Sequence, residues 1–122
     1  MRAKVFAVAL ILWSGRSVNA HERLTMVVSP VQSFAPTDLT VRIHVEPDPD
    51  NRVLEVVAES GEYYSSSRVQ LDGADAPRTI SLSIHHLPGG DYDVQSTLFN
   101  GAGHARGAVH KQVNVLKSEG SG

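Results

Sequence analysis

The chain has 122 residues, of which 11 are basic and 13 acidic, and its formal net charge is −2. It contains no cysteine, which excludes disulfides, thiol chemistry and cysteine-ligated zinc sites. The excess of acidic over basic residues argues against nucleic acid and anionic membranes as partners.

Residues 1–20 have the three parts of a secretory signal peptide. Arg2 and Lys4 give a positively charged start, and residues 5–13 form an apolar core that is too short to span a bilayer as a helix. We therefore expect cleavage after Ala20, export to the periplasm or the extracellular space, and no membrane insertion of the mature chain. Cleavage removes three of the 11 basic residues and none of the 13 acidic ones, so the mature net charge becomes −5.

After the signal, apolar and polar residues alternate between short turns, a pattern typical of an antiparallel β-sandwich. Within residues 39–45, for example, Leu39 and every second residue after it are apolar, and the residues between them are polar. We predict seven strands, at residues 24–29, 39–45, 52–59, 63–71, 78–84, 91–99 and 105–116.

Seven strands within residues 21–116 predict one immunoglobulin-like or fibronectin type III-like sandwich domain, followed by a disordered tail at residues 117–122. The stretch LPGGDYDV places a proline-glycine turn just before Tyr92 at the start of a strand. This favours a tyrosine corner, in which the Tyr92 hydroxyl bonds a backbone group upstream. The alternative is an ordinary hairpin with a half-buried tyrosine.

The strands of such a sandwich run up and down, so its connections alternate between two ends. Counting the crossings places the N-terminus and the loop that contains His104 at the same end. The same count brings the loop that contains Asp50 there as well. This end of the predicted fold therefore joins His21, His104 and Asp50.

An N-terminal histidine offers a metal ion both its free amine and its ring nitrogen. With the imidazole of His104, His21 would give a nitrogen-rich set that suits Cu(II), and zinc also accepts these ligands. Asp50 is a candidate oxygen ligand. Two hypotheses for cofactors remain open, namely none or one copper ion.

The last part of the chain carries a recognisable series of residues, with GGDYDV at residues 89–94, then His104 and Gly107, then VHKQVNV at residues 109–115. This series resembles the CopC-type periplasmic copper-resistance proteins, which are small, exported, cysteine-poor sandwiches whose mature chain begins with histidine. The resemblance implies a copper-binding protein with His21 and His104 as ligands.

Two positions depart from that family pattern. Ala102 stands where the family has an aspartate ligand, and Ala105 stands where a proline is common. Asp50, or Asp48 in the same loop, would have to supply the missing carboxylate.

Two other features are candidates for binding. Tyr63 and Tyr64 begin a polar strand, which is either an edge that binds a partner or sugar, or an edge made polar against aggregation. His85 and His86 are adjacent in a predicted strand, so we expect them on opposite faces as ordinary surface residues.

The sequence shows neither a nucleophile motif nor paired carboxylates nor a phosphate-binding glycine loop. It therefore favours a non-catalytic, exported immunoglobulin-like module, not an enzyme, that binds an unknown protein or surface ligand or serves as an accessory part of an assembly. This hypothesis rests on fold class. The alternative hypothesis is a periplasmic or secreted copper-binding protein that uses its N-terminal histidine.

Overall fold

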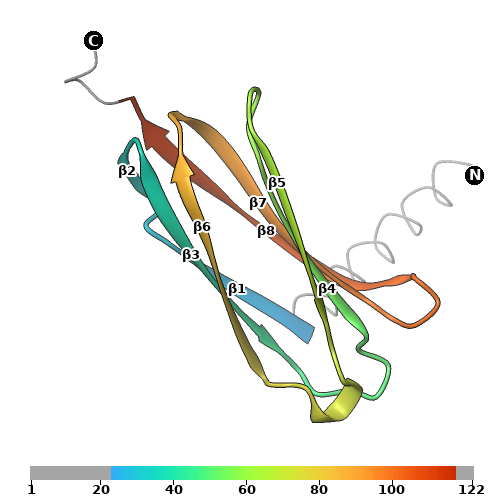
Figure 1. Cartoon of the computed structure of the whole chain (residues 1–122). Coiled ribbons are helices and arrows are strands. Elements are labelled where there is room, and N and C mark those ends of the chain that lie inside the picture. Colours follow the sequence, from blue (N-terminus) through green and yellow to red (C-terminus); the bar gives the residue numbers. More distant parts are fainter. Residues whose placement is uncertain (1–22, 118–122) are drawn as a thin grey trace, which may run out of the picture.

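The computed structural model describes residues 23–117 (Figure 1). The expected signal peptide, its cleavage site, His21 and all but the first residue of the expected tail lie outside these residues, so the domain boundaries stay predictions. No helical segment within residues 23–117 is long and apolar enough to cross a membrane. The chain forms β1 (Leu24–Ser29), β2 (Gln32–Phe34), β3 (Thr37–Val45), β4 (Val53–Glu59), β5 (Tyr64–Gln70), the 3-10 turn η1 (Gly73–Asp75), β6 (Thr79–Leu87), β7 (Gly90–Phe99) and β8 (Ala105–Leu116).

The strands form two sheets, which confirms the prediction of an all-β, immunoglobulin-like sandwich (Figure 1). One sheet has the strand order β1-β3-β6, and the other has the order β2-β8-β7-β4-β5. Neighbouring strands are antiparallel except for β2 and β8, which run parallel.

The predicted number of seven strands is wrong, because the structure has eight. The additional strand is β2, in which Gln32 pairs with Asn114 and Phe34 pairs with Leu116 near the end of β8. Strand β2 has three residues and lies between Pro30 and Pro36, so it is too short to show an alternating pattern. After β1 in the first sheet, the chain enters the second sheet as β2, which adds one parallel pair to a sandwich predicted to be wholly antiparallel.

The core lies between the sheets and is built from alternate positions of the strands. Burying one leucine or valine side chain contributes about 2 kcal/mol to stability. Because the chain has no cysteine, this core has to hold the two sheets together without disulfides. The buried apolar residues are Leu24, Met26, Val28, Leu39, Val41, Ile43, Val45, Leu54, Val56, Ala58, Leu71, Leu87, Tyr92, Val94, Leu98, Val109, Val113 and Val115.

Tyr92 is fully buried near the start of β7. Its hydroxyl donates a 2.8 Å hydrogen bond to the carbonyl of Pro88, four residues upstream. The ring of Tyr63 meets it edge-on, with 5.7 Å between the ring centroids. Burial raises the pKa of the Tyr92 hydroxyl. The tyrosine thus ties the turn between β6 and β7 to the core.

His85 and His86 are both exposed, as expected of surface residues, but they do not follow the alternation of a regular strand. The register of β3 and β6 shifts at this point, so that the two histidines stand opposite Asp38 alone. His86 has a positive φ of 60°, and its N–H donates to Asp38 Oδ1 at 2.9 Å. This β-bulge interrupts the alternation and leaves the two imidazole rings 6.3 Å apart between centroids.

The connections gather at the two ends of the sandwich. We call one end the loop pole; it comprises residues 46–52, 71–78 and 100–104 and lies at the lower end of Figure 1. The start of β1 joins it, because the N–H of Glu46 donates to the carbonyl of Arg23 at 3.0 Å. This arrangement agrees with the one counted from the predicted strands.

Candidate functional site

Asn51 is a polar residue buried in the loop between β3 and β4. Its Nδ2 donates to the carbonyl of Glu46 at 2.8 Å, and its Oδ1 accepts a hydrogen bond from Nη1 of Arg106. Its carbonyl accepts the N–H of Gly73 at 3.0 Å. Asn51 therefore links the β3–β4 loop to η1 and to the start of β8.

Gly73 makes this close approach possible. It has a positive φ of 61°, and a Cβ at this position would lie 3.0 Å from the carbonyl oxygen of Pro49. A larger residue would be strained by its backbone conformation and would push η1 away from the β3–β4 loop.

Arg106 is the cation of this network, and only 13% of its side chain is exposed. Its Nη2 lies 3.3 Å from Asp48 Oδ2, and its carbonyl accepts a 2.9 Å hydrogen bond from Nη1 of Arg23. Asp48 Oδ1 also accepts the N–H of Asp50 at 2.8 Å. The Asp50 N–H, and then the Arg106 guanidinium, lower the pKa of the Asp48 carboxyl against the opposing effect of desolvation.

The turn between β7 and β8 is held by the side chain of Asn100. Its Oδ1 accepts the backbone N–H groups of Ala102 and His104, both at 2.9 Å. Gly103 closes the turn with a positive φ of 85°. The backbone of His104 is thus fixed, while its side chain is exposed.

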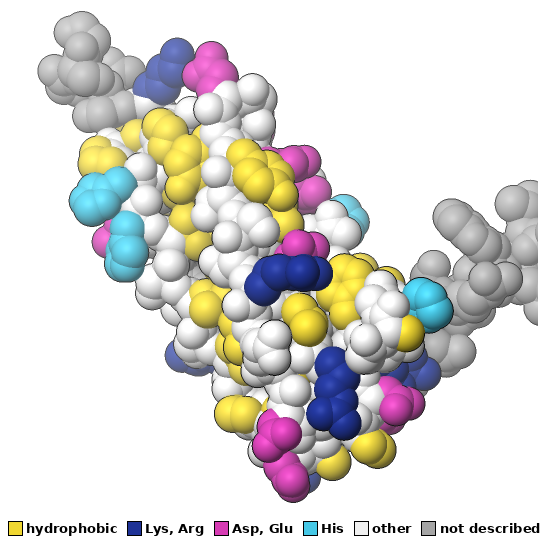
Figure 2. Space-filling view, turned by 45° about the vertical axis from the view of Figure 1, so that its right-hand side comes forward, with side chains coloured by type: hydrophobic (Ala, Val, Ile, Leu, Met, Phe, Trp, Pro, Cys, Tyr) yellow, Lys and Arg dark blue, Asp and Glu magenta, His cyan; other side chains and the backbone are white. Residues whose placement is uncertain are grey.

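A hollow lies at the loop pole between these two fixed loops. Its lining residues include Arg52, Arg68, Phe99 and Gly101. The Arg68 guanidinium carbon lies 5.7 Å from the centre of the Phe99 ring, and Arg68 Nε lies 3.6 Å from Glu55 Oε2. Figure 2 shows that acidic and basic side chains gather at this end of the molecule.

The predicted metal ligands are only partly placed. His104 and Asp50 both lie at the loop pole and are exposed, and His21 is outside the described residues. Within residues 23–117, no three histidine, aspartate or glutamate side chains gather in a way that would hold a metal ion. In the sequence, His21 precedes Arg23 by two residues and His104 precedes Arg106 by two residues. Arg23 and Arg106 are joined by the hydrogen bond described above.

The two predicted edge tyrosines have different environments. Tyr63 lies just before β5 and packs against the core through Tyr92. Tyr64 is the first residue of β5 and is 65% exposed. Only Tyr64 therefore presents its ring to a partner at this edge.

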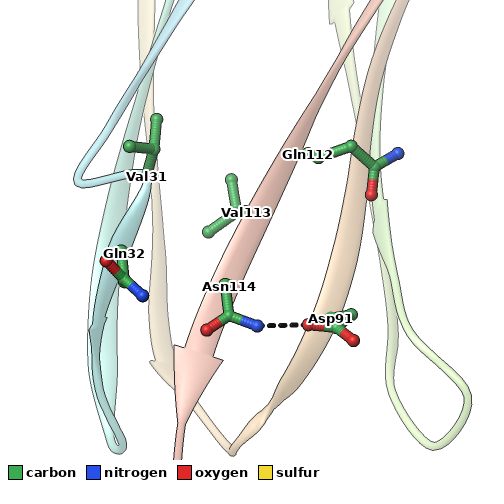
Figure 3. A pocket seen from close by; sticks show the side chains of 6 residues that line it. All are labelled: Val31, Gln32, Asp91, Gln112, Val113 and Asn114. Atoms are coloured by element: carbon green, nitrogen blue, oxygen red, sulfur yellow. Dashed lines mark hydrogen bonds between the residues drawn. The ribbon is translucent and has the colours of Figure 1, made fainter.

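A second hollow is lined by residues of β7 and β8, of β2 and of the turn before β2, and combines apolar, amide and carboxylate side chains (Figure 3). Asn114 Nδ2 donates to Asp91 Oδ1, so part of its polar lining is already paired internally. It is therefore a weaker candidate for ligand binding than the hollow at the loop pole. Its lining residues are Val31, Gln32, Asp91, Gln112, Val113 and Asn114.

The contact between Asn51 and Arg106 was not predicted from the sequence. Asn51 is one of several polar residues in a turn, and nothing in the local pattern marks it as buried. Arg106 falls on the outward-facing positions of its strand, so alternation predicts that it is exposed. Asn51 is buried and the Arg106 side chain is only 13% exposed, because residues 55 positions apart meet at the loop pole.

Replacing Asp48 by asparagine should lower the free energy of unfolding at neutral pH. It should also make this free energy depend less on pH in the acidic range. The Asp48 pKa is lower in the folded chain, so its ionised form stabilises the fold above its unfolded pKa, and this stability is lost as the pH falls below about 4. Urea unfolding of the wild type and Asp48→Asn should therefore give a difference in free energy that shrinks in acid.

The matched control is Asp50→Asn, because the Asp50 carboxylate forms no ion pair among residues 23–117. A difference between the wild type and Asp48→Asn that stays constant from neutral pH to acid would show that the ion pair with Arg106 does not act as described.

Neither a protein-family model nor a curated protein sequence matches this chain. Solved structures are similar to it in fold. The PKD domain of an M14-like peptidase from a Thermoplasmatales archaeon has 15% sequence identity and a TM-score of 0.53, over 77% of this chain and 93% of that chain. The CARDB domain of a Pyrococcus furiosus protein, solved with di-metal ions, has 14% identity and a TM-score of 0.52, over 78% and 94% of the two chains.

The superoxide reductase (neelaredoxin) of Ignicoccus hospitalis has 18% identity and a TM-score of 0.53, covering 75% of this chain and 79% of that chain. At such low identities the likeness establishes the fold alone. The comparisons and the strand order agree that the chain is an immunoglobulin-like β-sandwich.

Proposed function

We propose that this chain is a non-catalytic, exported immunoglobulin-like module that binds another protein or a surface ligand through its loop pole. The observation that supports this proposal is the hollow lined by Arg52, Arg68 and Phe99. The loops on either side of it are held by hydrogen bonds of the Asn51 and Asn100 side chains. The expected signal peptide supports export.

Fixed loops favour binding for a thermodynamic reason. A loop that is ordered before a partner arrives loses little conformational entropy on binding, so more of the contact energy appears as affinity. Here the amides of Asn51 and Asn100 order the loops on both sides of the hollow. Loops on a rigid scaffold carry binding residues in many proteins.

The side chains around the hollow are also of the right kind. Arginine and aromatic residues are enriched among those that dominate the energy of protein interfaces. Arg68 is positioned over the Phe99 ring, and Arg52 lines the same hollow. An accessory role is supported by the similar PKD domain, which is one domain of an M14-like peptidase.

The test uses the exported chain, immobilised and exposed to an envelope fraction of its own host. A partner identified by mass spectrometry is then purified, and its dissociation constant is measured. The double variant Arg52→Ala/Arg68→Ala should bind at least about thirtyfold more weakly, the effect of losing a dominant interface residue.

The matched control is Arg42→Ala/Lys111→Ala, which removes two exposed cations outside the loop pole and should leave binding unchanged. Full binding by the loop-pole variant would contradict the proposal. So would loss of binding on Tyr64→Ala alone, because that result would assign the partner to the β5 edge. Failure of the wild type to retain any partner above blank beads would also contradict it.

The second candidate function is Cu(II) binding by His21 and His104, with Asp50 as an additional ligand. The observation in its favour is the hydrogen bond from Arg23 Nη1 to the carbonyl of Arg106, a residue that follows His104 by two positions in the chain. The described residues do not form a metal site by themselves, so this candidate depends on His21. A bound copper ion would supply redox or storage chemistry, and the protein would hold it by imidazole and amine nitrogens.

Copper binding is tested on protein exported and processed by its host. Its mass should begin at His21, and one Cu(II) should bind with a nitrogen-rich tetragonal spectrum in electron paramagnetic resonance. His21→Ala and His104→Ala should each abolish this spectrum. His110→Ala, which changes an exposed histidine in the middle of β8, should preserve it. A different N-terminus, or weak binding without a fixed stoichiometry, would exclude this function.

A further inference from the structure

Strand β6 is an edge of the three-stranded sheet, and no strand of the described part of the chain pairs with its outer side. Its inward-facing residues Ile80, Leu82 and Ile84 are only partly buried. On β1, the opposite edge of the same sheet, every inward-facing residue is buried. The core is therefore incompletely covered along β6, and Figure 2 shows hydrophobic side chains reaching the surface on this side of the sandwich.

The backbone of β6 has hydrogen-bonding groups free at this edge. The N–H of Val45 donates to the carbonyl of Arg78 at 2.8 Å, and hydrogen-bonded pairs alternate along an antiparallel ladder. Residues 80, 82 and 84 therefore direct their backbone groups toward β3. Thr79, Ser81 and Ser83 direct theirs toward the free edge, where another strand can pair with them.

The free edge carries no charge that would repel another strand. Exposed edges are usually protected by lysine, proline, charged residues or bulges. Residues 79–84 have no charged side chain and no proline, and the bulge at His85 and His86 protects only the end of β6. The edge strand of the other sheet, β5, carries Arg68.

The sequence of β6 is complementary to itself. When two copies run antiparallel with a two-fold axis at Leu82, Leu82 faces its own copy and Ile80 faces Ile84 of the other chain. On the outer face, Ser81 faces Ser83. These two serines direct their backbone groups to the free edge, so the same register satisfies both side chains and hydrogen bonds.

We propose that the chain forms a homodimer in which β6 pairs antiparallel with β6 of a second copy, with the two-fold axis at Leu82. The two three-stranded sheets join into one continuous sheet, and the half-exposed residues Ile80, Leu82 and Ile84 are covered across the axis. Neighbouring registers are poorer. An axis at Ser81 places Arg78 against Ile84, and an axis at Ser83 places Ile80 against the bulge at His86.

A cysteine at the axis tests the register, because the chain has no cysteine of its own. In the proposed dimer, the two Leu82 residues form a non-hydrogen-bonded pair with Cα atoms about 4.5 Å apart, within the range of a disulfide. Leu82→Cys should therefore form a covalent dimer under mild oxidation. The control, Ser66→Cys on the exposed face of β5, should stay monomeric.

Charge at the edge tests the dimer without a cross-link. Ser81→Lys/Ser83→Lys places like charges opposite one another across the axis and should raise the dimer dissociation constant at least about tenfold in sedimentation velocity. Ser66→Lys should leave it unchanged. Circular dichroism of both variants shows whether the monomer remains folded.

The outcomes separate clearly. Dimers of the wild type that dissociate in the lysine double variant, together with cross-linking at position 82, support the proposal. A wild type that stays monomeric up to its solubility limit overturns it. A dimer that survives both lysines, or cross-linking at position 66 in place of position 82, overturns it too, because the copies then meet elsewhere. None of these results depends on the partner proposed for the loop pole.

Discussion

The buried amide of Asn51 is the interaction on which the loop pole depends. The β3–β4 loop has to cross from one sheet to the other, and Asn51 holds it by bonding the carbonyl of Glu46 and the guanidinium of Arg106. Leaving a buried polar group without a partner costs about 1–3 kcal/mol. The loop is therefore held in the one conformation that satisfies this amide, and η1 and the start of β8 are positioned by it.

Alternation along each strand is a local property, which is why most of the fold could be predicted from the sequence. Leu39 and the apolar residues that follow it at every second position are buried as expected. Strand β2 could not be predicted, because its three residues form a strand only through pairing with the distant end of β8. The bulge at His85 and His86 also depends on a distant residue, Asp38.

At the candidate site, too, some features depend on the local sequence pattern and others on contacts between distant residues. The topology was sufficient to place Asp50 and His104 at one end of the sandwich, because that depends only on the order of the strands. The network that makes this end rigid depends on Arg106, whose position in β8 predicts exposure although only 13% of its side chain is exposed. The hollow near Phe99 is lined by residues of the five-stranded sheet and of the loop pole, whereas β6 belongs to the three-stranded sheet.

Amide hydrogen exchange of the unliganded chain tests most directly whether the loop pole is fixed before any partner binds. We expect the amides of Asn51, Leu71, Gly73 and His104, all bonded within the loop pole, to exchange about as slowly as those of the central strands β3 and β4. Exchange at these four amides as fast as in an unstructured peptide, with β3 and β4 still protected, would contradict a loop pole that is fixed in advance, because the loops would then be ordered only on binding.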